Sequence, residues 1–199
     1  MKTLQIEMTT IRVPTKLKTL MKPYWITNRA IFFDVSTKST GWAAWDFETG
    51  FIRYGVLQAD GRESVLERIC KLSAMANRLL NDLSVSLSGI AIFIEEGVFK
   101  SKKTAMLLGE ARGAIMAAVR DRATCIKEIG NAVWKQFLRV QVDEKYDKEE
   151  KVHAHRNLEK ILETSVSVTH YGKEATYDES DALGGLLYAL CAIDLEEEE

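Results

Sequence analysis

The sequence predicts a mixed α/β fold, in which a three-strand antiparallel meander is extended by two parallel strands and flanked by helices. Between residues 30 and 57, short apolar runs are separated only by turns, which is typical of consecutive antiparallel strands. Further along the chain, apolar runs alternate with segments of helical periodicity, which is typical of strands joined by helical crossovers. Both prolines, Pro14 and Pro23, precede residue 30, so regular structure can continue from there.

The predicted meander consists of strands at residues 30–34, 40–45 and 51–57. The first run is Ala-Ile-Phe-Phe-Asp, and we expect a buried strand that ends in the carboxylate of Asp34. Thr49-Gly50 separates the second and third runs and indicates a tight turn. Short connections of this kind join strands that are neighbours in a sheet.

The remaining elements follow from hydrophobic periodicity. Residues 64–83 place Val65, Ile69, Leu72 and Leu79 on one side, which predicts a long amphipathic helix. The same reasoning predicts the other elements, which are helices at 104–119, 148–162 and 178–193 and strands at 90–94 and 124–129.

The composition is that of a folded globular protein. Hydrophobic residues make up 46% of the chain and charged residues 28%, which excludes wholesale disorder. The apolar runs are far shorter than the roughly 20 residues that cross a bilayer, and the N-terminus lacks the apolar segment of a secretory signal. Cys70, Cys125 and Cys191 lie in apolar surroundings and predict reduced core thiols. We therefore expect a cytoplasmic protein.

The net charge of −2 hides an uneven distribution of charge along the chain. Residues 1–29 carry six basic residues against one acid, whereas residues 194–199 read Asp-Leu-Glu-Glu-Glu-Glu. We therefore expect a basic N-terminal arm at 1–29, one globular domain at 30–193 and an acidic tail at 194–199. The arm has three other interpretations. One is a mitochondrial presequence, although the segment is poor in Arg and Ser. The others are an upstream extension that precedes Met21 and a segment that crosses to a partner subunit.

Acidic side chains stand at the ends of several predicted elements. Asp34 closes the first strand, Glu95 and Glu96 follow the strand at 90–94, and Asp178 and Asp181 open the last helix on one shared face. Converging carboxylates repel one another unless cations lie between them, and hard oxygen ligands suit Mg²⁺ or Mn²⁺. Such a cluster predicts two-metal hydrolysis of a phosphodiester. Taken alone, each acid is more often a solvated loop residue or, at the helix start, a cap.

Five segments, in order, resemble the motifs of RuvC-like Holliday-junction resolvases. They are Asp34-Val-Ser-Thr-Lys-Ser-Thr-Gly-Trp42, Ile94-Glu-Glu-Gly-Val-Phe99, Leu108-Gly-Glu-Ala-Arg-Gly113, Val133-Trp-Lys-Gln136 and Asp178-Glu-Ser-Asp-Ala-Leu183. The second segment is one residue longer than the family's apolar-Glu-x-Val-Phe, and the fourth has a Trp inserted into Val-Lys-Gln. Asp178 stands where many bacterial members have His, so the chain is similar to members with an all-carboxylate site, some of them viral.

The resemblance implies an RNase H-like fold, a homodimer, and paired symmetric nicking of four-way DNA junctions with two Mg²⁺ ions per active site, for which Mn²⁺ substitutes. It assigns the metal ligands and catalytic acids to Asp34, Glu95, Asp178 and Asp181. Glu96 stays a candidate because it fits the spacing to Val98-Phe99, whereas Glu95 directly follows the strand and is favoured. The expected DNA contacts are Phe99, Lys100, Lys102, Lys103 and Lys135.

The acids do not by themselves encode the substrate, because one fold hosts many activities. A broader branched-DNA nuclease, a ribonuclease H and a junction-binding protein that does not cleave therefore remain alternatives.

Overall fold

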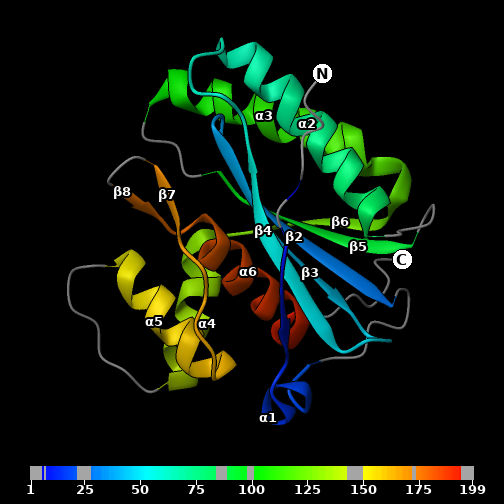
Figure 1. The fold of residues 1–199 in the computed structure, drawn as a ribbon, viewed down its shortest axis with the longest axis vertical. Coiled ribbons are helices and arrows are strands. Elements are labelled where there is room, and N and C mark those ends of the chain that lie inside the picture. Colours follow the sequence, from blue (N-terminus) through cyan, green and yellow to red (C-terminus); the bar gives the residue numbers. More distant parts are fainter. Residues whose placement is uncertain are drawn as a thin grey trace.

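The computed structural model describes residues 6, 8–21, 28–83, 89–97, 101–142, 150–171 and 174–193. One sheet contains six strands in the order β1-β4-β3-β2-β5-β6 (Figure 1). The strands are β1 (Thr9–Arg12), β2 (Arg29–Val35), β3 (Ser39–Asp46), β4 (Phe51–Gln58), β5 (Ile90–Glu95) and β6 (Ala123–Ile129). A separate hairpin pairs β7 (Thr169–Tyr171) with β8 (Glu174–Thr176).

The helices are α1 (Thr15–Lys18), α2 (Val65–Asp82), α3 (Lys102–Val119), α4 (Asn131–Val142), α5 (Glu150–Leu162) and α6 (Asp178–Ala192), with a short 3₁₀ turn at Arg120–Arg122. The bounds of α2, α3, α5 and α6 agree closely with those of the four predicted helices. At the start of α2, Ser64 caps the helix and exchanges hydrogen bonds with Glu67, which fixes the first turn. Of the helices in the described part of the chain, none has both the length and the apolar character to cross a bilayer.

The predicted sheet is confirmed. β2, β3 and β4 form the antiparallel meander, and β5 and β6 extend it in parallel from β2. The parallel pairs are joined through α2 and α3, as expected for crossover connections. The mixed sheet with helices on both faces is therefore the α/β fold that the sequence predicted.

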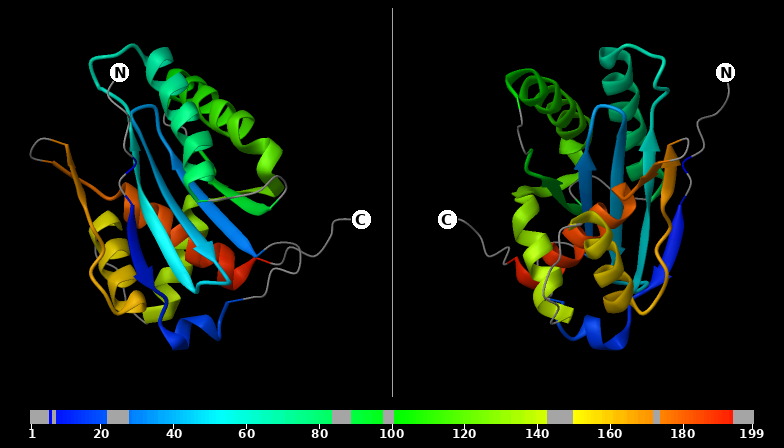
Figure 2. Two further views of the ribbon diagram at one scale, coloured as in Figure 1. Left: turned by 45° about the vertical axis from the view of Figure 1, so that its right-hand side comes forward. Right: turned by 90° about the vertical axis from the view of Figure 1, so that its left-hand side faces the viewer.

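Helices cover both faces of the sheet (Figures 1 and 2). Successive side chains of a strand point to opposite faces. On β2, Ile31 and Phe33 join the apolar cluster that contains α2 and α3, whereas Ala30 and Phe32 join the cluster that contains α4, α5 and α6. Asp34 is two residues beyond Phe32 and so lies on the α6 face.

Several elements were not expected from the sequence. Part of the predicted arm joins the domain, because β1 pairs antiparallel with β4 and Leu17 of α1 is buried in the core. The helix α4 and the β7–β8 hairpin were also missed.

Cys70 is exposed on α2, so its prediction as a core thiol was wrong, whereas Cys125 and Cys191 are partly buried. The acidic tail at 194–199 lies outside the described residues.

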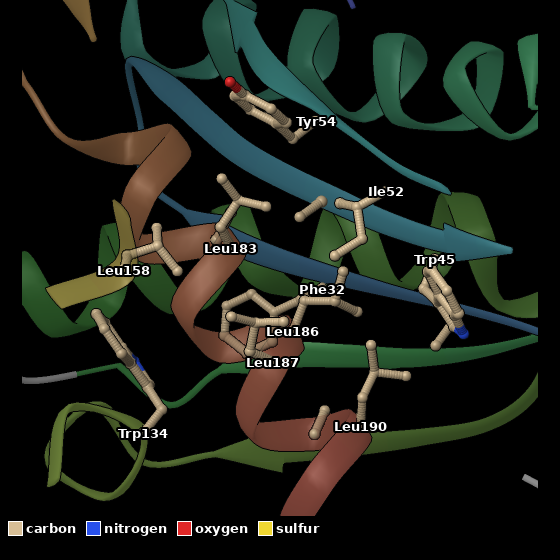
Figure 3. Close-up of a cluster of buried hydrophobic side chains, with 14 of the residues drawn as sticks. Phe32, Trp45, Ile52, Tyr54, Trp134, Leu158, Leu183, Leu186, Leu187 and Leu190 are labelled. Carbon is tan, nitrogen blue, oxygen red and sulfur yellow. The ribbon is translucent and has the colours of Figure 1, made fainter. Parts of the chain in front are cut away.

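The helix α6 is buried on nearly all sides and forms the centre of one helical layer. Figure 3 shows Phe32 of β2 beside Leu186 and Leu187 of this helix. The contact is close because Gly185 has no side chain: a Cβ at this position would lie 2.2 Å from Cζ of Phe32. Gly185 therefore sets the distance between α6 and the sheet.

Replacing Gly185 by alanine should destabilise the fold by about 1–3 kcal/mol, because the methyl group would force Phe32 or the helix to move. Gly109→Ala is the matched control, since a Cβ at this helical glycine meets nothing within 4 Å, and it should be neutral or slightly stabilising. Urea unfolding of both variants measures the difference. Equal stability of the two variants would contradict this view of the α6 contact.

Candidate active site

Two acids lie at the C-terminal ends of neighbouring parallel strands, at the same end of the sheet; this end is called the acidic edge below. Phe32 is paired with Phe93 and Phe33 with Ile94, so continuing this register places Asp34 beside Glu95. Phe93 belongs to the same apolar cluster as α6, and strand alternation therefore puts Glu95 on the α6 face, next to Asp34. Glu96 follows the strand and is exposed. The register thus brings Glu95, rather than Glu96, to Asp34.

The first turn of α6 lies over this edge. Gly41 of β3 is the cross-strand partner of Asp34, and a Cβ on Gly41 would lie 2.0 Å from the carbonyl oxygen of Asp178. Only glycine permits this approach of a helix to a strand backbone. The carboxylate of Asp178 accepts a hydrogen bond of 2.5 Å from Ser39 Oγ, two residues before Gly41 on the same face. Asp181, three residues along the helix, shares the face of Asp178.

The charges of these acids act on one another. Burial raises the pKa of Asp34 well above its ordinary value, and the negative charges of Glu95, Asp181 and Asp178 and a hydrogen bond with Glu95 raise it further. An acid whose pKa rises because other acids surround it is typical of functional sites. The structure therefore brings Asp34, Glu95, Asp178 and Asp181 together.

Glu95 is held by two side chains that the sequence analysis did not select. Asn131 Nδ2 and Trp134 Nε1 both donate to Glu95 Oε1, the latter over 3.0 Å. Both donors come from the first turn of α4, a helix that was not predicted. The signal available in the sequence was Trp134 itself, which departs from the family's Val-Lys-Gln.

The donor chemistry of the four acids fits a hard divalent cation. Carboxylate oxygens are the ligands that Mg²⁺ and Mn²⁺ prefer, and a cation would relieve the repulsion that raises the pKa of Asp34. Within the described ranges, no three His, Cys, Asp or Glu side chains are grouped closely enough to hold a metal ion as they stand. One oxygen of Glu95 and one of Asp178 accept hydrogen bonds from protein donors, and the four acids would have to come closer together to enclose a cation.

Three of the expected DNA contacts can be placed. Lys102 and Lys103 are exposed in the first turn of α3. Lys135 is partly exposed, and its Nζ lies 5.1 Å from the centroid of the Trp134 ring, beside the residue that holds Glu95. Phe99 and Lys100 lie outside the described residues.

The order of the six strands, with helices on both faces of the sheet, matches the RNase H-like fold of RuvC. RuvC of Thermus thermophilus, solved with a Holliday junction substrate, superposes with a TM-score of 0.58 at 19% identity, covering 81% of this chain and 94% of that one. A second structure of Thermus thermophilus RuvC has a TM-score of 0.55 at 20% identity, with coverages of 81% and 95%.

The yeast mitochondrial Holliday junction resolvase has a TM-score of 0.53 at 12% identity and covers 87% of this chain and 81% of its own. No protein-family profile matches the sequence, and no curated protein sequence matches it. The chain therefore has the fold of the RuvC-type resolvases, as its sequence motifs implied.

Because the pKa of Asp34 is raised in the folded protein, ionisation of this side chain destabilises the folded state. The folded protein keeps the Asp34 proton to a higher pH than the unfolded chain, so the unfolding free energy falls as pH rises above about 4, the ordinary aspartate value, and through the folded pKa. Asp34→Asn should therefore be more stable than the wild type at pH 7 without divalent ions, and equally stable near pH 4. A gain of about 1 kcal/mol corresponds to about 2–4 °C in Tm.

Thermal unfolding in EDTA between pH 4 and 8 measures this dependence. Asp60→Asn is the control, because hydrogen bonds from Arg62 lower the pKa of Asp60 to about 2 and its removal should give no stabilisation at pH 7. A Tm difference between wild type and Asp34→Asn that does not change with pH would contradict the electrostatic origin.

Gly41→Ala should lower the unfolding free energy by about 1–3 kcal/mol and displace the start of α6, because its methyl group overlaps the Asp178 carbonyl. Gly61→Ala, in a loop where a Cβ meets nothing within 4 Å, is the matched control. Urea unfolding gives the stability, and loss of the pH-dependent Asp34→Asn stabilisation in the Gly41→Ala background reports the displacement. Full additivity of the two substitutions would argue against it.

Proposed function

We propose that this protein is a metal-dependent, structure-selective endonuclease that resolves four-way DNA junctions by paired symmetric nicks. The observation that carries the proposal is the convergence of four acids around Asp34. The fold, which is shared with two junction resolvases, supports it, and so does the match of all four acids to the resolvase motifs. The activity is that of a crossover junction endodeoxyribonuclease, a hydrolase of phosphodiester bonds with a role in DNA recombination and repair.

Asp34, Glu95 and Asp181 would hold two Mg²⁺ or Mn²⁺ ions, with Asp178 completing the second site. Ions bound there supply positive charge for an attacking water and for the departing 3′ oxygen of the scissile phosphodiester. The strands set the spacing of Asp34 and Glu95, and Ser39 orients Asp178 through its hydrogen bond. The rigid sheet edge and the first turn of α6 thus present the acids from backbone that has little freedom to move.

Cationic side chains on α3 and α4 would bind the DNA backbone. Lys102, Lys103 and Lys135 are proposed to neutralise phosphates, with Phe99 and Lys100 in the connection before α3. A homodimer suits the substrate, because a four-way junction has twofold symmetry and a dimer would present two equivalent sites. We propose that the protein acts in the cytoplasm of a bacterium or a virus-infected cell.

The deciding experiment incubates the protein with a synthetic four-way junction labelled strand by strand, in Mg²⁺ or Mn²⁺. A linear duplex, a fork, a flap and an RNA–DNA hybrid are run in parallel. We expect paired symmetric nicks in the junction and ligatable products. Cutting of forks and flaps as well would make the protein a broad branched-DNA nuclease, cutting of the hybrid alone a ribonuclease H, and binding without cleavage a junction-binding protein.

Asp34→Asn should lower the cleavage rate by roughly 1,000-fold or more and leave the Kd for the junction unchanged, because Asp34 would act on the cation rather than on DNA affinity. Asp60→Asn, which changes an exposed acid on the loop before α2, should cleave like the wild type. Rates come from denaturing gels and Kd values from binding in EDTA. Near wild-type cleavage by Asp34→Asn would remove Asp34 from the active site.

A further inference from the structure

Two side chains at the start of α4 donate hydrogen bonds to the Glu95 carboxylate. Asn131 Nδ2 and Trp134 Nε1 end on the same oxygen, Oε1, the indole contact measuring 3.0 Å. Two donors on one oxygen fix the position and the plane of a carboxyl group without using its second oxygen, Oε2. The arrangement therefore orients Glu95, and neither donor engages Oε2. The Asp34 carboxyl is also hydrogen-bonded with Glu95, and a bound cation would take the place of that shared proton.

The chain delivers both donors to this place through the sheet. Glu95 is paired with Ile129 at the end of β6, and α4 begins two residues later at Asn131. Asn131 and Trp134 are three residues apart, so they lie on the same face of the helix, one turn from each other. The register of β5 and β6 thus sets the first turn of α4 against Glu95.

Trp134 also contacts the other acid-bearing element. Its side chain is fully buried, at 0% exposure, and it lies beside α6 (Figure 3). A Cβ on Gly184 would lie 2.7 Å from Cζ3 and 2.8 Å from Cε3 of the indole, so glycine is what lets the ring lie against this helix. One edge of the indole touches α6 and the other edge holds Glu95. The ring therefore sets the position of Glu95 relative to the helix that carries Asp178 and Asp181.

Glu95 needs such restraint because three other acids lie near it, and once Asp34 is ionised their charges oppose one another. Asp34, Asp178 and Asp181 crowd the same edge, and like charges in one site push apart. A glutamate without fixed partners can turn its carboxylate toward solvent at little cost. Donors that rise from a packed helix oppose this movement.

We propose that Asn131 and Trp134 are positioning residues that hold Glu95 by Oε1 and keep Oε2 for a divalent cation. This inference rests on the proposed function, because it assigns a task within the same acidic site. Partners that orient a metal ligand in this way typically change metal affinity or activity by about 10–100-fold when removed.

The test uses Trp134→Phe, which keeps an aromatic ring but removes the N–H, and Asn131→Leu, which removes the amide with little change in volume. Trp45→Phe is the matched control. Trp45 is 4% exposed and faces the same core, and its indole N–H has no hydrogen-bond partner among the described residues. All three variants lose a polar group, but only two of them lose a contact with Glu95.

Two readouts are independent of DNA cleavage. The first is the indole N–H resonance of Trp134 in the full-length protein, which should shift in Glu95→Gln and on addition of MgCl₂, while that of Trp45 stays. The second is Mn²⁺ affinity, measured by electron paramagnetic resonance of the free ion. Trp134→Phe and Asn131→Leu should each bind Mn²⁺ about 10-fold more weakly, whereas Trp45→Phe should bind like the wild type.

Cleavage then separates positioning from general stability. In both Glu95-contact variants, the Mg²⁺ concentration for half-maximal junction cleavage should rise about 10-fold and junction affinity in EDTA should not change. A merely structural role would lower Tm and leave the Mg²⁺ titration where it is. Wild-type Mn²⁺ affinity in both variants, or a Trp134 resonance that ignores Glu95→Gln, would overturn the inference.

The wild type alone tests the proposed function. If it binds Mn²⁺ and the variants bind it more weakly, but no DNA is cut, the nuclease proposal fails and the positioning role stands. If the wild type cleaves junctions and the variants keep its metal dependence, the positioning role fails and the nuclease proposal stands. A wild type that binds no Mn²⁺ would overturn both.

Discussion

The arrangement of the acidic site depends on one close contact, the first turn of α6 against the backbone of β3 at Gly41. A Cβ there would lie 2.0 Å from the Asp178 carbonyl oxygen, so the helix reaches this depth only because residue 41 has no side chain. Gly185 permits the matching contact with Phe32 further along the same helix. Because Gly41 and Gly185 have no side chains, α6 can pack close to the sheet. This packing brings Asp178 within hydrogen-bond distance of Ser39, near Asp34 at the end of β2.

This approach has an electrostatic cost, which the surrounding structure opposes. Burial, together with the negative charges of Glu95, Asp181 and Asp178, raises the pKa of Asp34, so the four carboxyl groups oppose one another's ionisation. Packing holds them in place: α6 is buried on nearly all sides, and β2 and β3 lie at the centre of the sheet. The packing of the core thus offsets the repulsion between these acids, as expected where a site serves function rather than folding.

Hydrogen bonds then decide how individual acids are turned. Ser39 donates to Asp178, and the first turn of α4 donates to Glu95 through Trp134. Trp134 also packs on Gly184, so the helix α4 couples the acid at the end of β5 to the helix that carries the other acids. The sheet register therefore places Asp34 beside Glu95, the close packing of α6 brings Asp178 and Asp181 to them, and the side-chain donors orient individual carboxylates.

The sequence by itself determined the meander, the two parallel strands, four helices and the acids at their ends, because strand and helix periodicity and strand-end carboxylates are local signals. Only the tertiary structure separated Glu95 from Glu96, since this depends on the face to which the register of β5 against β2 turns each side chain. It also placed β1 at the sheet edge and Asn131 and Trp134 at Glu95. These are contacts between residues distant in the chain, and no local pattern encodes how two elements meet.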